Sequence, residues 1–143
     1  MSNSREKIFN AFLASRKVCT DTRTIEINSI YFALKGERFN GNDFLRQALD
    51  AGCAWVVGDE DKLIDPRFIL VENALKALQD LALDYRKTWK FPVLAITGSN
   101  GKTTTKELVR DVLAKKFRVH ATRGNLNNHI GIPLTILETP SDT

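Results

Sequence analysis

The chain has 143 residues, of which 43% are hydrophobic and 27% are charged, and its formal net charge is +4. This is the size and composition of a soluble globular protein with a real core, and no apolar run approaches the roughly 20 residues of a membrane-spanning helix. The amino-terminal residues contain no long apolar stretch, which argues against a secretory signal peptide and favours a cytoplasmic protein.

The charge is distributed unevenly along the chain. Residues 1–91 carry a net charge of +1, whereas residues 92–143 carry +3. This excess suits a polyphosphate ligand, and the absence of a basic run with interleaved aromatic residues makes nucleic acid a weak alternative. The two cysteines, Cys19 and Cys53, do not have the spacing of a zinc site and are expected to be small buried side chains.

Helix-like and strand-like patterns alternate over the first two thirds of the chain. In chain order they predict a helix over 4–15, a strand over 29–36, a helix over 42–52, strands over 53–59 and 67–72, and a helix over 74–89. Gly52 is expected to end the second of these helices. Such alternation is typical of an α/β fold.

Pro92 marks the predicted start of a second segment. This segment is expected to contain a strand over 93–97, a glycine loop, a helix over 102–117, a further strand over 118–123 and a helix that begins near Gly131–Pro133. Two strands are too few for a parallel sheet that is covered on both faces. We therefore expect 1–90 to form one domain and 91–143 to be the beginning of a larger parallel-sheet domain, which makes the chain a fragment.

The glycine loop, TGSNGKTTTKE, has the residue types of a phosphate-binding loop. Gly98 and Gly101 allow a tight turn that brings backbone N–H groups to an anion, and the following helix adds its own free N–H groups. Lys102 supplies a point charge, and the Thr103 hydroxyl is placed to bind magnesium. The spacing is shorter than in the usual P-loop pattern, which would place its first glycine at Ile96.

Three motifs resemble the Mur ligases, cytoplasmic enzymes that build the peptide stem of bacterial peptidoglycan. TGSNGKTTTKE resembles the ATP-binding loop of that family, and the stretch CTDTR…AWVVGD (19–59) is similar to its uridine-nucleotide-binding domain. GNLNNHIGIPLTIL (124–137) resembles the members that add D-alanyl-D-alanine, although members that add the third stem residue share the loop and a DSR-like motif. The resemblance spans 18–137. It implies a small UDP-sugar-binding α/β domain followed by the start of a P-loop ATPase domain.

The resemblance implies a ligation reaction that consumes ATP. The γ-phosphoryl group is transferred to the terminal carboxylate of UDP-N-acetylmuramoyl-tripeptide (UDP-MurNAc-tripeptide), and the amine of D-alanyl-D-alanine then attacks the acyl phosphate to form an amide. Lys102 is the implied catalytic cation, and Mg²⁺ is implied on Thr103. The implied ATP-binding residues are Gly98, Ser99, Asn100, Gly101, Lys102, Thr103 and Thr104.

The turn that contains Thr22 and Arg23 is the implied contact with the UDP group. The planar guanidinium of Arg23 suits a diphosphate or a uracil edge, and a surface salt bridge with Asp21 or Glu26 is the alternative. The Thr22 hydroxyl can bond the same ligand or only cap the backbone of its turn.

Asn127 and Asn128 match a family segment near the reacting end of the substrate, where an amide can orient oxygen atoms without adding charge. Three positions depart from the family pattern. His129 replaces a common acidic residue, and Asn40 and Asn42 replace an aspartate and a histidine.

A second hypothesis is a binding module that recognises a UDP-sugar or a nucleotide without catalysis. The unfinished sheet predicted for 91–143 argues against it. If the chain is part of a ligase, residues 1–143 alone are not expected to catalyse the reaction. In the presence of all three substrates, the rate of phosphate release is then expected to stay at the background rate. The open edge of that unfinished sheet is a candidate site for pairing with a second copy of the chain.

Overall fold

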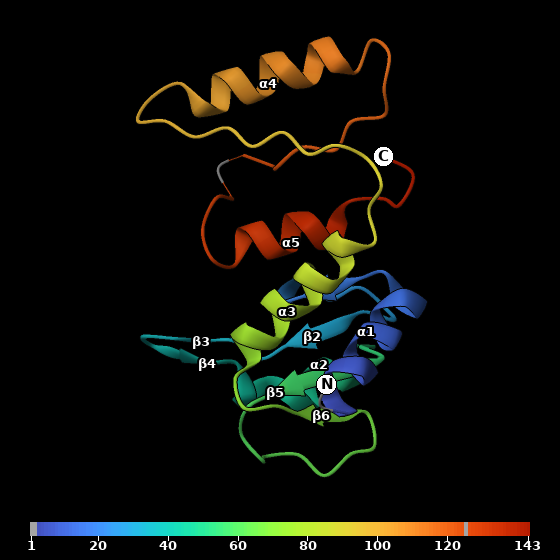
Figure 1. Cartoon of the computed structure of the whole chain (residues 1–143). Coiled ribbons are helices and arrows are strands. Elements are labelled where there is room, and N and C mark those ends of the chain that lie inside the picture. The colour runs from blue at the N-terminus through green and yellow to red at the C-terminus, as the bar shows by residue number, and fades with distance from the viewer. Residues whose placement is uncertain (1–2, 125) are drawn as a thin grey trace.

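Four short parallel strands form the centre of the fold (Figure 1). In the computed structural model, which describes residues 3–124 and 126–143, the sheet has the order β1-β2-β5-β6. The strands are β1 (Val18–Cys19), β2 (Ile30–Phe32), β5 (Trp55–Gly58) and β6 (Phe68–Leu70). The register places Ile30 opposite both Val18 and Trp55. The predicted α/β class with a parallel sheet is confirmed.

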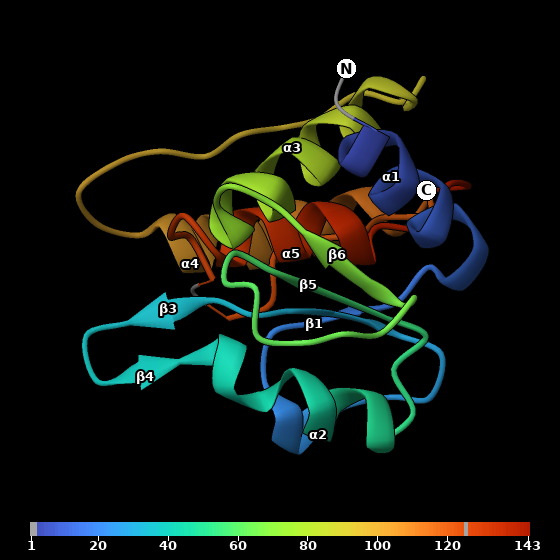
Figure 2. The same ribbon diagram turned by 90° about the horizontal axis from the view of Figure 1, so that it is seen from below.

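Helices cover both faces of this sheet (Figure 2). One face carries α1 (Asn3–Ser15), α3 (Ala74–Lys87) and α5 (Gly131–Glu138), and the other carries α2 (Leu45–Asp50). Because side chains alternate along a strand, β2 contributes to both cores. Its Ile30 and Phe32 side chains pack on the α1 and α3 side, and Tyr31 packs on the α2 side.

A short hairpin follows β2 and leads to α2. It consists of β3 (Lys35–Gly36) and β4 (Phe39–Asn40), which pair antiparallel, and it is followed by the 3₁₀ turn η2 (Gly41–Phe44). A Cβ atom at Gly41 would lie 2.7 Å from the backbone of Leu34. Only glycine therefore allows the chain to return so closely to the end of β2.

A buried amide connects this hairpin to the end of β5. Asn42 is 2% exposed, and its Oδ1 accepts from the N–H groups of Asp59 (3.0 Å) and Glu60 (3.3 Å). Its Nδ2 donates to Asp59 Oδ1 and Asn40 Oδ1, both at 2.9 Å. Burial raises the pKa of Asp59, but hydrogen bonds from Lys35, Asn42 and a backbone N–H outweigh it and lower that pKa.

Replacement of Asn42 by alanine is expected to lower the free energy of unfolding by about 2–3 kcal/mol, because it leaves buried donors and a carboxylate without their partner. Urea denaturation of the variant measures this change. Asn10→Ala removes an exposed amide from α1 and is the matched control, for which we expect a change within about 0.5 kcal/mol. Equal stability of the two variants would contradict a structural role for the Asn42 network.

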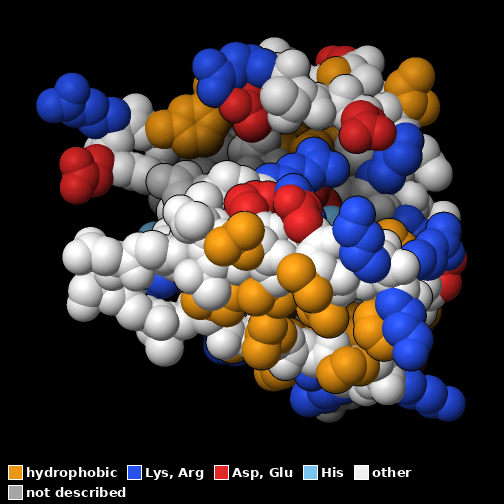
Figure 3. All heavy atoms as spheres, turned by 90° about the horizontal axis from the view of Figure 1, so that it is seen from above, with side chains coloured by type: hydrophobic (Ala, Val, Ile, Leu, Met, Phe, Trp, Pro, Cys, Tyr) orange, Lys and Arg blue, Asp and Glu red, His pale blue; other side chains and the backbone are white. Residues whose placement is uncertain are grey.

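The chain after Pro92 leaves the sheet and carries α4 (Lys102–Leu113), which lies apart from the layered body (Figure 1). None of the described residues of α4 is buried, and Leu108, Val112 and Phe117 are exposed. Figure 3 views the molecule from this side and shows hydrophobic side chains gathered on it. The apolar face of the helix is therefore not covered by the described part of the chain.

Two predicted strands and one predicted helix end are wrong in this region. Residues 93–97 and 118–123 are not strands in the described structure, and the helix predicted over 102–117 ends at Leu113. A strand needs a neighbour for its backbone N–H and C=O groups, and no described strand lies beside either segment. Apolar periodicity alone cannot supply that neighbour.

Helix α5 returns to the sheet-bearing part of the chain and packs on α3. Leu137 is buried in the same core as Phe12, and the Tyr85 hydroxyl donates to the Thr139 carbonyl at 2.8 Å. The boundary predicted between 1–90 and 91–143 stays a prediction. None of the helices within 3–124 and 126–143 is long and apolar enough to cross a membrane.

Candidate functional site

The glycine loop forms an open turn in front of α4. Gly101 has a left-handed backbone (φ +77°, ψ 0°) and caps the helix, and Gly98 has φ +152°. L-residues with a side chain rarely adopt these values, so the two glycines are needed for the path of the chain. The loop is exposed, and an incoming ligand can approach its backbone.

The first turn of α4 presents backbone donors beside this loop. The helical ladder begins with the Thr105 N–H, which donates to the Gly101 carbonyl at 2.9 Å, and no described side chain caps the helix. The N–H groups of the three preceding residues, Lys102–Thr104, are thus outside the ladder at the positive end of the helix dipole. This is the arrangement in which helices bind phosphate.

Two side chains add to these donors. The Lys102 ammonium folds back over the loop and donates to the Gly98 carbonyl. Thr103 is exposed on the first turn of the helix, so its hydroxyl is open to a metal ion. The donor set therefore fits a triphosphate with Mg²⁺: backbone N–H groups and one ammonium meet the phosphates, and one hydroxyl oxygen meets the metal.

Lys106 was not identified as a site residue from the sequence. It lies one turn after Lys102, and its Nζ donates to the carbonyls of Thr122 (2.6 Å) and Gly124 (2.8 Å). Its side chain is only 16% exposed and also pairs with Glu107 at 3.0 Å. Lys106 therefore holds the segment before Asn127 against α4, and its four-residue spacing from Lys102 was the available signal.

The asparagine segment leads into α5. The Asn128 Oδ1 accepts from the backbone N–H groups of Ile130 (3.1 Å) and Gly131 (2.7 Å), so this oxygen caps the start of the helix. Asn127 is exposed. Asn125, which belongs to the same motif, lies outside the described residues. The substrate roles predicted for Asn127 and Asn128 remain predictions, with the Asn128 amide nitrogen as the donor not used by the cap.

Gly131 determines how closely this segment approaches α5. A Cβ atom at Gly131 would lie 2.8 Å from the backbone of Leu126. Any larger residue would therefore displace the chain that carries Asn127, and the glycine has a packing role as well as a place in the motif.

The turn with Thr22 and Arg23 is held by one carboxylate. Asp21 accepts from the Arg23 N–H at 2.9 Å, and its carboxylate pairs with the Arg23 guanidinium at 2.6 Å. Hydrogen bonds from the Arg23 side chain and backbone lower the pKa of Asp21 to about 2. The salt bridge considered from the sequence is thus present, with Asp21 and not Glu26, but the guanidinium is still 86% exposed.

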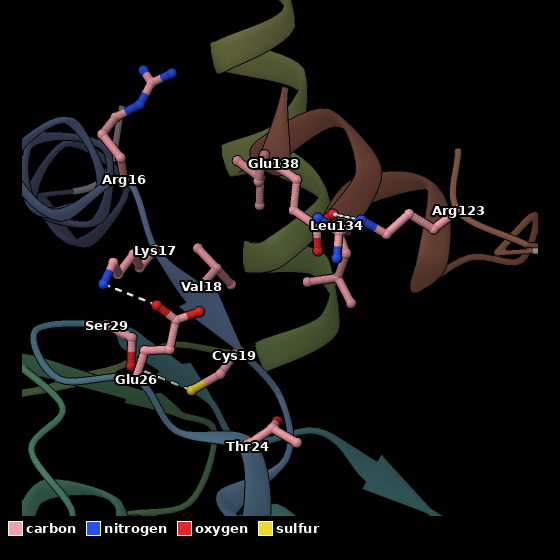
Figure 4. A pocket seen from close by; sticks show the side chains of 11 residues that line it. Arg16, Lys17, Val18, Cys19, Thr24, Glu26, Ser29, Arg123, Leu134 and Glu138 are labelled. Atoms are coloured by element: carbon pink, nitrogen blue, oxygen red, sulfur yellow. Dashed lines mark hydrogen bonds and ion pairs between the residues drawn. The ribbon is translucent and has the colours of Figure 1, made fainter. Parts of the chain in front are cut away.

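A cavity of about 280 Å³ lies between the chain around this turn and the second segment (Figure 4). Thr24 and Glu26 line it from the first segment, and Arg123 and Glu138 line it from the second. Arg123 was also missed from the sequence; its Nε lies 3.5 Å from Glu138. Arg123 lies between the two residues whose carbonyls accept from Lys106. The segment 122–124 therefore contacts the cavity through Arg123 and the helix after the glycine loop through Lys106.

Both segments of the chain match models of one known protein family. Residues 16–95 match the family model described as Mur ligase family, catalytic domain, and residues 96–143 match the Mur ligase middle domain. The chain is similar to the UDP-N-acetylmuramoyl-tripeptide–D-alanyl-D-alanine ligase of Bacillus subtilis (strain 168), with 48% identity over 129 residues, which is 88% of this chain and 28% of that protein. It is 38% identical over 120 residues to the ligase of the same name from Escherichia coli (strain K12), covering 84% of this chain and 26% of that protein.

Two solved structures are similar as well. The crystal structure of MurF ligase from Thermotoga maritima in complex with ADP has a TM-score of 0.79 and 31% identity, covering 96% of this chain and 30% of that chain. A crystal structure of MurF from Acinetobacter baumannii has a TM-score of 0.80 and 36% identity, covering 88% and 28%. The chain therefore spans 28% of the length of the Bacillus relative, and similar shares of the others.

Proposed function

The chain belongs to the Mur ligase family, and we propose that it provides the nucleotide-sugar site and the triphosphate loop of a ligase that joins D-alanyl-D-alanine to UDP-MurNAc-tripeptide. The observation that supports this proposal is the contact between the helix after the glycine loop and the stretch of chain that lines the cavity beside the Arg23 turn. Lys106 holds residues 122–124 against α4, directly after the phosphate loop, and the neighbouring Arg123 faces the cavity beside the Arg23 turn. The proposed reaction is a step of peptidoglycan precursor synthesis in the cytoplasm, where ATP and nucleotide sugars are available.

The chemistry requires activation of a carboxylate. A carboxylate carries negative charge and has no leaving group, so an amine does not displace its oxygen at neutral pH. Transfer of the γ-phosphoryl group of ATP to the carboxylate gives an acyl phosphate, which the amine attacks; the tetrahedral intermediate then expels phosphate and leaves the amide.

In the first step, the residues of this chain would bind the phosphates of ATP and stabilise the negative charge that develops as the γ-phosphoryl group is transferred. The free N–H groups of Lys102–Thr104 and the Lys102 ammonium would hold the β- and γ-phosphates and stabilise the negative charge that develops between them. Mg²⁺ held by the Thr103 hydroxyl would supply further positive charge to the same oxygens. The amides of Asn127 and Asn128 would orient phosphate or substrate oxygens without adding charge.

Calorimetric binding to the purified chain tests the proposed function directly. We expect saturable binding of UDP-MurNAc-tripeptide, weaker binding of UDP-GlcNAc, and separate binding of Mg·ATP. Equal affinity for UDP-MurNAc-dipeptide and the tripeptide would instead favour the family members that add the third stem residue. Absence of any binding of the muramoyl nucleotides would overturn the proposed substrate.

Replacement of Arg23 by alanine is expected to weaken binding of UDP-MurNAc-tripeptide by about 10- to 100-fold, because it removes a charge-assisted contact with the diphosphate or the uracil. Titration calorimetry measures the change, with Mg·ATP affinity unchanged. Arg67→Ala is the matched control, since Arg67 pairs with Asp65 through the same backbone and side-chain bonds at the opposite edge of the parallel sheet, before β6. An equal loss in both variants would show that Arg23 acts only through stability.

A further inference from the structure

The two cysteines lie on either side of one buried hydroxyl, outside the residues that the proposed reaction uses. The Ser29 Oγ lies 3.6 Å from the Cys19 Sγ and 3.3 Å from the Cys53 Sγ. Cys19 is 8% exposed, Cys53 is 2% exposed and Ser29 is 1% exposed. Both cysteines are free thiols and buried, as predicted from the sequence.

The sheet holds these three residues together although Cys19 and Cys53 are far apart in sequence. Cys19 ends β1 and is in register with Tyr31 of β2, and Ser29 directly precedes β2. The Ser29 carbonyl accepts from the Ala54 N–H at 2.8 Å, which fixes the loop that carries Cys53. Because both sulfurs contact the same Ser29 hydroxyl oxygen, they lie close to each other. The hydrogen-bonded backbone of β1, β2 and the loop before β5 holds them there.

The hydrogen bonds of this group favour one thiolate. A hydrogen bond with Cys19 lowers the pKa of Cys53, and the Ser29 hydroxyl acts in the same direction, although burial opposes them. The same contact with Cys53, together with burial, raises the pKa of Cys19. Cys53 is therefore the better nucleophile of the pair and suits the resolving step, whereas Cys19, which keeps its proton, must release that proton when its sulfur attacks.

A small reagent can reach the group from the cavity shown in Figure 4. Cys19 and Ser29 line that cavity together with polar side chains, among them Lys17 and Glu26, which pair at 2.9 Å. Cys53 is not among the lining residues and lies behind Ser29. The cavity therefore gives access to one thiol and leaves the second one sheltered.

We propose that Cys19 and Cys53 form a reversible disulfide site that is oxidised by a small peroxide entering this cavity. The Cys19 sulfur attacks one oxygen of the peroxide, the O–O bond breaks, and the second oxygen leaves with the thiol proton as water, so that Cys19 becomes a sulfenic acid. The Cys53 sulfur then attacks the Cys19 sulfur, the S–O bond breaks, and the hydroxyl leaves with the Cys53 proton as a second water. The two thiols lose two electrons in total, and the peroxide gains them.

The disulfide would connect the end of β1 to the loop before β5. Asp21, which holds the Arg23 turn, follows Cys19 by two residues. Oxidation would thus act next to the proposed nucleotide-sugar site without using any of its predicted ligand contacts.

The test is a thiol map of the full chain after exposure to hydrogen peroxide. The reduced protein is treated with peroxide, denatured in iodoacetamide, digested and analysed by mass spectrometry. We expect loss of both alkylatable thiols and a single linked peptide pair joining Cys19 to Cys53, which dithiothreitol separates. Two alkylatable thiols after treatment, oxygen addition to one cysteine without a link, or a link only between two chains would each overturn the proposal.

A single substitution separates the two steps. In Cys53→Ala the resolving thiol is missing, so Cys19 is expected to remain as a sulfenic acid that dimedone labels, whereas the unsubstituted chain is expected to show little labelling. Absence of dimedone adduct in a folded Cys53→Ala variant would contradict the proposed order of attack. If this variant does not fold, the peptide map of the unsubstituted chain decides the proposal by itself.

Discussion

Replacement of Lys102 by alanine is expected to weaken binding of Mg·ATP by about 100-fold, which corresponds to about 2.7 kcal/mol. The ammonium of this residue lies over the glycine loop and would meet the β- and γ-phosphates together with the first backbone N–H groups of α4. Its removal leaves the backbone donors in place, so binding is reduced and not abolished. Titration calorimetry at constant ionic strength measures the loss.

Lys115→Ala is the control for this effect. It removes the same charge from an exposed position just beyond the other end of α4, and long-range electrostatics at physiological salt predict a change of less than about threefold. A similar loss in both variants would show that the general positive charge of the segment binds ATP. No loss in either variant would place the nucleotide elsewhere.

Phe12→Ala is expected to lower the free energy of unfolding by about 3–5 kcal/mol, the cost of truncating a fully buried aromatic side chain. Phe12 is 0% exposed and its ring meets Tyr85 edge to face, with the centroids 5.1 Å apart. Tyr85 in turn donates to the Thr139 carbonyl, so the cavity left by Phe12 would weaken the contact that holds α5. Urea denaturation followed by circular dichroism measures the loss.

Leu13→Ala tests whether this cost comes from burial. Leu13 is the next residue of α1 and is 47% exposed, so its truncation is expected to cost less than about 1 kcal/mol. A large loss in this variant would mean that helix formation, and not the core around Phe12, limits stability. The ligand-binding predictions above are best tested in variants that keep this core.

Local signals account for most of the elements that were predicted correctly. The helix predicted over 74–89 is observed at Ala74–Lys87, and the Asn73 side chain caps it by accepting from the Lys76 N–H at 2.7 Å. Gly52 ends α2 with φ +105°, a value that side chains disfavour. Such features depend on a few neighbouring residues, so the sequence pattern is sufficient to predict them.

The two strand predictions that failed required a partner far away in the chain, and the helix end that failed depended on a local turn. Residues 93–97 have the apolar character of a strand, but a strand forms only where another strand accepts and donates its backbone hydrogen bonds. The helix predicted to reach Phe117 ends at Leu113, after which the Lys116 N–H donates to the Leu113 carbonyl in a tighter turn. Periodicity cannot distinguish a continuing helix from such a turn.

The sequence by itself was enough to predict the chemistry of the glycine loop, because the two glycines, the lysine and the threonine lie within six consecutive residues, 98–103. Only the tertiary structure decided which groups lie next to that chemistry. Lys106 reaches the carbonyls of Thr122 and Gly124, and Ser29 brings together Cys19 and Cys53. These contacts depend on where the sheet and α5 return the chain, and that path is set by the packing of the whole core and not by the residues beside each site.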